Sequence, residues 1–449
     1  MSENEEGGVN PPSPDEIKKD LEELFRDKYG ANINMVIGDD PAGIDLLEKM
    51  DAGEQLGETE QDNESQKEIK MENLRQFKMS PKEVKSYLDR FVIKQDEAKK
   101  ALSIAICDHY NHVRRCLEDP EADDMHYYKQ NILLMGPTGV GKTYLIKLIS
   151  ELLGVPYVKA DATRFTEIGY VGSNVDDLCK DLVTKAGGDI SLAQYGIIFL
   201  DEADKLASGT GGANGKEVGS RGVQFGLLKL MEDTEVNLTS PHDMASQIQS
   251  LMEFQKNGKV EPKLLNTKHV LFIVSGAFTG LEDIVSKRLK MRTIGLTKGT
   301  EDKSVLSKIY KNATTGDFIS YGLEAEFIGR LPVRVSCDEL SAEDLTKVLG
   351  ESEESLILQY VDSFKGHGID VRFTTCAISE IAKLAFGEKT GARGLMTVME
   401  KILREYKYEL PSSSIDTIQI NSEIIRNPDV ELTKLLNSFD QVPPQVPIQ

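Results

Sequence analysis

Short apolar runs alternate with the periodic patterns of amphipathic helices between about residue 79 and residue 340. The runs contain few polar positions, as strands do when helices cover both faces of their sheet. They cover Asn131–Met135, Pro156–Lys159, Gly196–Leu200, His269–Val274 and Leu331–Val335. Strands that alternate with helices predict an α/β domain with a mostly parallel sheet over residues 79–340.

The pattern changes at Ser341. Helical periodicity dominates from there to about Leu410, and the sequence Ser341-Ala342-Glu343-Asp344 is typical of a capped helix start. These features predict a smaller, mainly helical domain over residues 341–430. Residues 431–449 end in the proline-rich sequence QVPPQVPIQ and are expected to form a tail.

Residues 1–78 are predicted to form an acidic N-terminal region and linker. Residues 1–75 carry 21 Asp and Glu against 8 Lys and Arg, which accounts for more than half of the formal net charge of -21. A short amphipathic helix is expected from Pro14 to about Tyr29, and residues 51–70 have the polar composition of a flexible linker. An acidic chain gains little from a phosphate backbone, so nucleic acid is not an expected partner.

The overall composition, with 39% apolar and 28% charged residues, is that of an ordinary soluble protein. No apolar run approaches the roughly 20 residues of a membrane span, and the N-terminus is acidic and polar. The five cysteines form no C-x-x-C pair, which favours neither a disulfide framework nor a zinc site. We therefore expect a cytoplasmic protein with no membrane segment and no zinc.

A glycine-rich stretch follows the first predicted strand and precedes an amphipathic helix. It reads Gly136-Pro137-Thr138-Gly139-Val140-Gly141-Lys142-Thr143 and fits the pattern of a phosphate-binding loop. The glycines allow backbone N–H groups to face the phosphates of a nucleotide, Lys142 adds a positive charge, and Thr143 offers a hydroxyl to Mg²⁺. We assign nucleotide binding to these eight residues and to Tyr144, the next residue in the chain.

Two carboxylates follow the predicted strand Gly196–Leu200. Asp201 lies 58 residues after Thr143, and Glu202 comes next. An apolar strand that ends in acidic residues is the usual partner of a phosphate-binding loop. Asp201 is predicted to hold Mg²⁺ together with Thr143, and Glu202 to polarise the water that attacks the nucleotide.

The motifs GPTGVGKT and FLDEADK resemble those of the ClpX family of AAA+ protein unfoldases, and the resemblance extends from about Met79 to Leu410. It implies an AAA+ P-loop domain followed by a small AAA+ domain. It also implies an ATPase that uses ATP and Mg²⁺, forms a homohexamer, unfolds protein substrates and feeds a ClpP-like peptidase.

The resemblance assigns roles to further residues. Val92 and Ile93 match the apolar pair that packs on the adenine, while Lys94 stands where the family usually has glycine and leaves the local turn open. Arg330 matches the arginine finger that reaches the nucleotide of a neighbouring subunit. Arg393 matches the sensor-2 arginine, which reads the nucleotide in its own subunit. Ser275 is a weaker candidate for sensor 1.

Three loops resemble the parts of the family that handle protein. Tyr170 and Val171, between glycines, match the pore loop that grips the substrate. Residues 216–224 resemble the second pore loop, although Arg221 replaces an expected acid. The tripeptide Ile294–Leu296 resembles the segment that docks on ClpP, with leucine where phenylalanine is commoner.

The chain also departs from the family. Residues 1–78 contain no cysteine, so the N-terminal zinc-binding domain is not expected, and a mixed-charge insertion over residues 239–263 replaces the basic loop at the pore entrance. The sister unfoldase HslU is disfavoured, because residues 173–196 leave no room for its large inserted domain. Two alternatives stay open: a stand-alone remodelling ATPase without a peptidase, and a scaffold that uses nucleotide only to assemble.

Overall fold

The computed structural model describes residues 70–119, 121, 127–165, 174–207, 220–238, 263–292 and 309–440. All of them belong to one compact unit, Ser65–Gln449. The expected N-terminal helix and nearly all of the expected linker lie outside the described residues.

The centre of the first domain is a five-stranded sheet in the order β2-β3-β6-β1-β7, and every neighbouring pair is parallel. The strands are β1 (Ile132–Met135), β2 (Tyr157–Asp161), β3 (Ile197–Asp201), β6 (Leu271–Gly276) and β7 (Val333–Ser336). Every residue of β1 and β6 is buried, which explains their continuous apolar sequences. The predicted parallel sheet is therefore confirmed, and its order places the carboxyl ends of β1, β3 and β6 next to one another.

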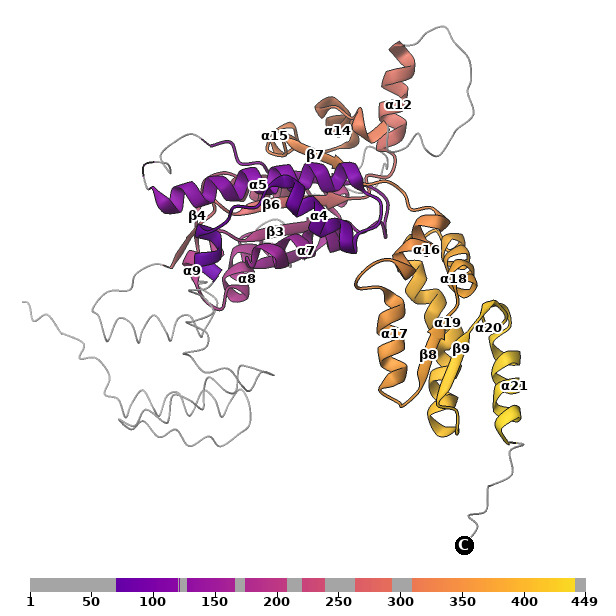
Figure 1. Cartoon of the computed structure of the whole chain (residues 1–449). Helices are drawn as coiled ribbons and strands as arrows, with labels where there is room; N and C mark the ends of the chain where they lie inside the picture. The colour runs from indigo at the N-terminus through magenta and orange to yellow at the C-terminus, as the bar shows by residue number, and fades with distance from the viewer. Residues whose placement is uncertain are drawn as a thin grey trace, which may run out of the picture. The chain divides into compact units, whose positions relative to one another are not determined.

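Helices cover this sheet, as Figure 1 shows for α5 on one side and α7 and α8 on the other. The helices of this domain are α4 (Pro81–Phe91), α5 (Asp96–Glu118), α7 (Lys142–Leu153), α8 (Asp177–Lys185), α9 (Ile190–Ala193), α10 (Ser220–Met231), α12 (Leu281–Arg292), α14 (Thr315–Tyr321) and α15 (Ala325–Gly329). A short antiparallel pair, β4 (Glu235–Asn237) and β5 (Leu264–Asn266), flanks the mixed-charge insertion predicted over residues 239–263.

Local sequence explains where the helices begin and end. Ser80 caps α4 in a capping box with Glu83, and Pro81 occupies the first helical position. Helix α7 starts directly after Gly141, which has a φ of 95°, and ends at Gly154, which has a φ of 67°. Glycine tolerates both conformations, so the phosphate-binding loop passes into α7 without strain.

The second domain is mainly helical, as predicted. Its elements are α16 (Ala342–Gly350), α17 (Leu356–Lys365), β8 (Asp370–Phe373), α18 (Thr375–Gly387), α19 (Arg393–Glu409), β9 (Thr417–Ile420), α20 (Ser422–Arg426) and α21 (Pro428–Asp440). Ser341 caps α16 in a capping box with Asp344, which confirms the expected helix start. The sequence did not predict the parallel pairing of β8 with β9, and the expected boundary at residue 430 falls inside α21.

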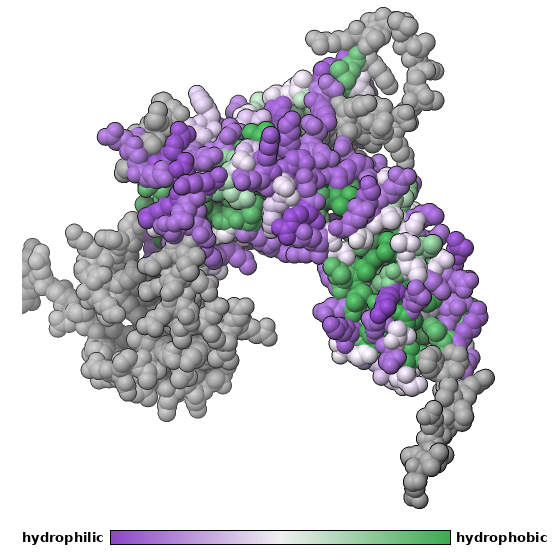
Figure 2. Space-filling view, in the orientation of Figure 1, coloured by the Kyte–Doolittle hydropathy of each residue, from purple (hydrophilic) through white to green (hydrophobic). Residues whose placement is uncertain are grey.

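Polar side chains cover most of the surface that Figure 2 shows, but apolar areas are visible on the second domain. The exposed large apolar side chains of that domain are Leu358, Leu384, Phe386, Met396, Tyr408 and Val430. None of the described helices combines the length and the apolar character that crossing a membrane requires.

Candidate nucleotide site

The phosphate-binding loop lies at the carboxyl end of β1, an interior strand of the sheet, and leads into the N-terminus of α7. Backbone N–H groups at a helix N-terminus have no partner within the helix and attract anions. Gly139 has a φ of 75°, and a Cβ atom placed on it would collide with the carbonyl oxygen of Thr390. Glycine is therefore required here both for the turn and for the close approach of the second domain.

Lys142 is the first residue of α7, and its side chain folds back over the loop. Its Nζ donates hydrogen bonds to the carbonyl oxygens of Gly136 at 2.7 Å and Pro137 at 2.8 Å. Burial lowers the pKa of Lys142. A phosphate bound in the loop would supply the negative partner that this desolvated ammonium group favours.

The two expected carboxylates lie at the end of β3, next to this loop. The hydroxyl of Thr143 donates to Oδ2 of Asp201 at 3.3 Å, and Nζ of Lys159 lies 3.5 Å from the same oxygen. A hydroxyl beside a carboxylate is a set of hard oxygen ligands that fits Mg²⁺. The contact with Lys159 was not predicted, because it depends on the pairing of β2 with β3.

Glu202 follows Asp201 with an exposed side chain and a left-handed backbone, with a φ of 56°. A residue other than glycine rarely adopts this conformation, and such strained residues concentrate at functional sites. The backbone N–H of Glu202 donates to Oδ1 of Asp201 at 3.1 Å. The turn therefore presents the Glu202 carboxylate to the solvent-accessible space beside the loop.

A cavity of about 660 Å³ joins these groups. Thr138 through Tyr144, Asp201 and Glu202 line it from the first domain, and Ala392 and Arg393 line it from the second. Its apolar lining includes Val92, Ile93, Leu340, Val348, Leu395 and Met396. The structure thus brings most of the residues predicted to bind the phosphates, the adenine and the metal to one cavity, together with Arg393, the predicted sensor-2 residue.

The second domain also touches the phosphate-binding loop directly. The backbone N–H of Ala392 donates to the carbonyl oxygen of Gly139 at 2.8 Å, just before Arg393 begins α19. On the other side of the cavity the Tyr144 hydroxyl donates to Oε2 of Glu354 at 2.8 Å. Neither contact was predicted, because each joins segments that are more than 200 residues apart.

The turn after Val92 and Ile93 has a left-handed backbone at Lys94, the position where glycine is usual in the family. The φ angles are 62° at Lys94 and 59° at Gln95. Lys94 therefore has a backbone conformation that glycine tolerates more readily, and it adds a charged side chain to the turn.

Four predicted residues in the described part of the chain do not line this cavity: Gly136 and Pro137, at the start of the loop, and Ser275 and Arg330. Ser275 is buried in β6 next to the lining residue Gly276, and its hydroxyl has no hydrogen-bond partner among the described residues. Arg330 lies at the end of α15, where its Nη2 is 2.5 Å from Oε1 of Glu232. The roles expected for Ser275 and Arg330 stay predictions.

Several predicted segments lie outside the described residues. They include Tyr170 and Val171, the docking tripeptide Ile294–Leu296 and most of the insertion at 239–263. Of the second pore-loop segment only residues 220–224 are described, and there Arg221 lies 2.7 Å from Oε1 of Glu324. Among the described residues no group of three or more metal-ligand side chains is positioned to hold an ion.

Comparison with known proteins identifies the fold and the family. A family model described as AAA domain (Cdc48 subfamily) matches residues 128–334. The similar proteins include three that bear the name ATP-dependent Clp protease ATP-binding subunit ClpX. The protein of Treponema denticola is 37% identical over 354 residues, which are 78% of this chain and 81% of the relative. That of Borrelia duttonii is 38% identical over 355 residues, or 78% and 80% of the two chains.

The third relative, from Azotobacter vinelandii, is 36% identical over 340 residues, which are 74% of either chain. The three matches each cover about three quarters of this chain. With its parallel sheet, its phosphate-binding loop and a second domain that reaches that loop, the chain belongs to the ClpX family and is an AAA+ ATPase.

Proposed function

We propose that this chain is an ATP-driven protein unfoldase that works with a ClpP-like peptidase. The observation that carries the proposal is the cavity shared by the two domains, with the phosphate-binding loop on one side and Ala392 and Arg393 on the other. A ligand that contacts both domains favours the arrangement in which both contacts are made. Binding and loss of the γ-phosphate would therefore change how the second domain is held, which is the motion an unfoldase needs.

Four residues of the first domain are proposed to carry out hydrolysis. Lys142 and the loop N–H groups hold the phosphates, and Thr143 and Asp201 would hold Mg²⁺, which supplies charge neutralisation at the phosphates. Glu202 orients the attacking water and accepts its proton. The 3.3 Å contact between Thr143 and Asp201 supports this assignment.

We propose that Arg330 completes the site of a neighbouring subunit in a homohexamer. Its side chain is 51% exposed and lies outside the cavity of its own subunit, so it is accessible to another chain. A site that takes a residue from a neighbour requires a head-to-tail interface, and a ring closes such interfaces.

The parts that handle protein are proposed from the family. Tyr170 and Val171 would grip the substrate chain in the pore, and Ile294–Leu296 would dock on the peptidase. The relatives are named as subunits of a Clp protease, and we extend that partnership to this chain, with the cytoplasm as its compartment. A stand-alone remodelling ATPase and a nucleotide-assembled scaffold are the alternatives.

The experiment that tests the proposal follows the fluorescence of stably folded fluorescent proteins that carry unstructured tails of varied sequence. We expect the parent protein with ATP to unfold at least one of them. The variant Glu202→Gln should bind nucleotide but fail to unfold the fluorescent protein. The variant Tyr170→Ala should hydrolyse ATP but unfold the fluorescent protein more slowly. Hydrolysis that survives Glu202→Gln, or unfolding that Tyr170→Ala leaves unchanged, would contradict the corresponding assignment. A last experiment asks whether a peptidase co-purifies with the chain. Co-purification that is lost when Ile294–Leu296 are deleted would support unfolding coupled to a peptidase over stand-alone remodelling.

A further inference from the structure

The turn between α4 and α5 contains two successive left-handed residues, neither of which is glycine. Lys94 and Gln95 have φ angles of 62° and 59°. Side chains rarely tolerate this conformation, and it persists where the surrounding structure holds it. The turn follows Val92 and Ile93, which line the nucleotide cavity, so whatever holds the turn also positions that side of the cavity.

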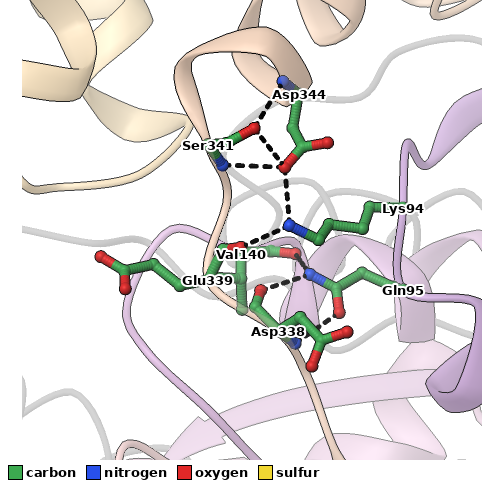
Figure 3. Close-up of polar contacts among 7 residues, drawn as sticks. All are labelled: Lys94, Gln95, Val140, Asp338, Glu339, Ser341 and Asp344. Carbon is green, nitrogen blue, oxygen red and sulfur yellow. Dashed lines mark hydrogen bonds and ion pairs between the residues drawn. The ribbon is translucent and has the colours of Figure 1, made fainter. Parts of the chain in front are cut away.

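Gln95 attaches the turn to the segment that links the two domains. Its buried amide Nε2 donates to the carbonyl oxygen of Asp338 at 2.7 Å and to that of Val140 at 3.3 Å. Its Oε1 accepts from the backbone N–H of Asp338 at 2.7 Å. Figure 3 shows this amide between the phosphate-binding loop and the linking segment. One side chain therefore contacts both structures that a change of nucleotide state would move.

Lys94 extends the attachment to the first helix of the second domain. Its Nζ donates to the carbonyl oxygen of Glu339 at 2.9 Å and to Oδ2 of Asp344 at 2.7 Å. The same carboxylate oxygen accepts from the N–H and the hydroxyl of Ser341, each at 2.8 Å, in the capping box of α16 (Figure 3). The Lys94 ammonium group thus binds the element that fixes where α16 begins.

The charge on Asp344 fits this arrangement. Burial raises the pKa of Asp344, but the hydrogen bonds from Lys94 and Ser341 outweigh that effect and leave its pKa below the usual value. The side chains of Lys94 and Asp344 are 34% and 18% exposed, so water screens the pair only in part.

We propose that Lys94 is a positioning residue. It fixes the position of α16, and with it that of the second domain, relative to the nucleotide cavity. The inference rests on the nucleotide site proposed above. Val92 and Ile93 precede the turn, and Asp344 belongs to the domain that supplies Arg393. A nucleotide that contacts both domains is therefore bound more tightly when the Lys94–Asp344 pair is formed, although Lys94 itself does not line the cavity.

The test uses two variants that remove the amino group in different ways. Lys94→Met keeps the aliphatic stem, and Lys94→Gly removes the side chain but suits the left-handed turn. Both should raise the KM for ATP and the Kd of a fluorescent ADP analogue about two- to fivefold, the range for a partly exposed ion pair. The kcat should change by less than about twofold, because the amino group does not contact the reacting atoms.

Stability separates this role from a purely structural one. Lys94→Gly relieves the left-handed strain, so its midpoint in urea should equal or exceed that of the parent protein. If Lys94→Gly binds nucleotide more weakly than the parent protein but is no less stable, the loss of affinity results from lost positioning and not from partial unfolding. The matched control is Lys85→Met, which also replaces a lysine by methionine. Lys85 lies on α4, and its contacts with Asp89 and Asp96 are both within the first domain. Its KM should be unchanged.

A double-mutant cycle tests the partner. Asp344→Asn keeps an oxygen for the helix cap but removes the charge, and the double variant with Lys94→Met should bind nucleotide no more weakly than the weaker single variant. Unchanged nucleotide affinity in both Lys94 variants, or additive effects in the double variant, would overturn the inference. The variant Lys142→Ala reports on the site itself: if it binds nucleotide as the parent does, the proposed site fails, whatever the Lys94 variants show.

Discussion

Gly139 lies at the point where the phosphate-binding loop meets the second domain. Its backbone has a φ of 75°, and its missing Cβ leaves room for the carbonyl oxygen of Thr390 and for the hydrogen bond from Ala392. The sequence pattern predicted a glycine that allows a turn, but it did not predict a glycine that allows domain contact. The second requirement arises between segments that are far apart in the chain.

Gly154 offers a matched comparison for this position. It also has a left-handed φ, 67°, but no atom lies within 4 Å of a Cβ placed on it. We expect Gly154→Ala to lower the free energy of unfolding by about 1–2 kcal/mol, the cost of left-handed alanine. Gly139→Ala adds a steric clash and should cost about 3 kcal/mol, with nucleotide binding lost as well. Urea unfolding and nucleotide titration of both variants provide the measurement, and equal losses would contradict the close contact.

Several site residues could be predicted from sequence because their signal is local. Lys142, Thr143 and Asp201 belong to motifs in which a strand, a turn and a helix follow one another, so spacing alone places them. Lys94 and Glu354 carry no such signal. Their partners, Asp344 and Tyr144, are more than 200 residues away, and only the fold brings them together.

At the scale of elements, the strands of the large sheet could be predicted and those of the small one could not. Parallel strands buried on both faces have continuous apolar sequences, which is why β1 and β6 stand out. Strands β8 and β9 have only four residues each, alternate between buried and exposed positions, and lie between strongly periodic helices. Their pairing depends on how α17, α18 and α19 pack, and no short stretch of sequence specifies it.

Helices α12 and α14 flank residues 293–308, which contain the proposed docking tripeptide. Asp317 joins them: its carboxylate accepts bonds from Arg288 of α12 at 2.8 Å and from the N–H of Thr314, which caps α14, at 2.7 Å. Burial raises the pKa of Asp317, but these bonds outweigh burial and lower it overall. Asp317 should therefore hold together the two helices on either side of the residues that contain the proposed docking tripeptide.

We expect Asp317→Asn to lower the free energy of unfolding at pH 7 by about 2 kcal/mol, because it leaves the Arg288 guanidinium without its charged partner. Because the folded-state pKa of Asp317 is lowered, its contribution is complete above the usual Asp pKa of about 4 and is lost as the pH falls through the lower folded value. Urea unfolding at a series of pH values should show the gap between the parent and the variant narrowing below about pH 4. A gap that stays constant over this range would exclude the charged interaction as its cause.

At the scale of the whole molecule, the cavity of one chain is lined by two basic residues predicted to act on the nucleotide, Lys142 and Arg393, but not by the third, Arg330. In its own subunit Arg330 lies outside the cavity and pairs with Glu232. An exposed ion pair of this kind contributes at most about 1 kcal/mol to stability. Arg330 would therefore lose little free energy if it left Glu232 to bind a phosphate on a neighbouring chain. The position of Arg330 is therefore compatible with the proposed assembly, which rests on the family resemblance.

The measurement that tests this shared site most directly is ATP hydrolysis by mixtures of two inactive variants. Arg330→Ala and Glu202→Gln should each lose about 100-fold or more of the parent rate. In a mixed ring, a Glu202→Gln subunit can present its intact Arg330 to a neighbour whose Glu202 is intact, so mixing should restore part of the activity. If Arg330 acts within its own subunit, or if no ring forms, the mixture will be as inactive as its components, and that result would contradict the account.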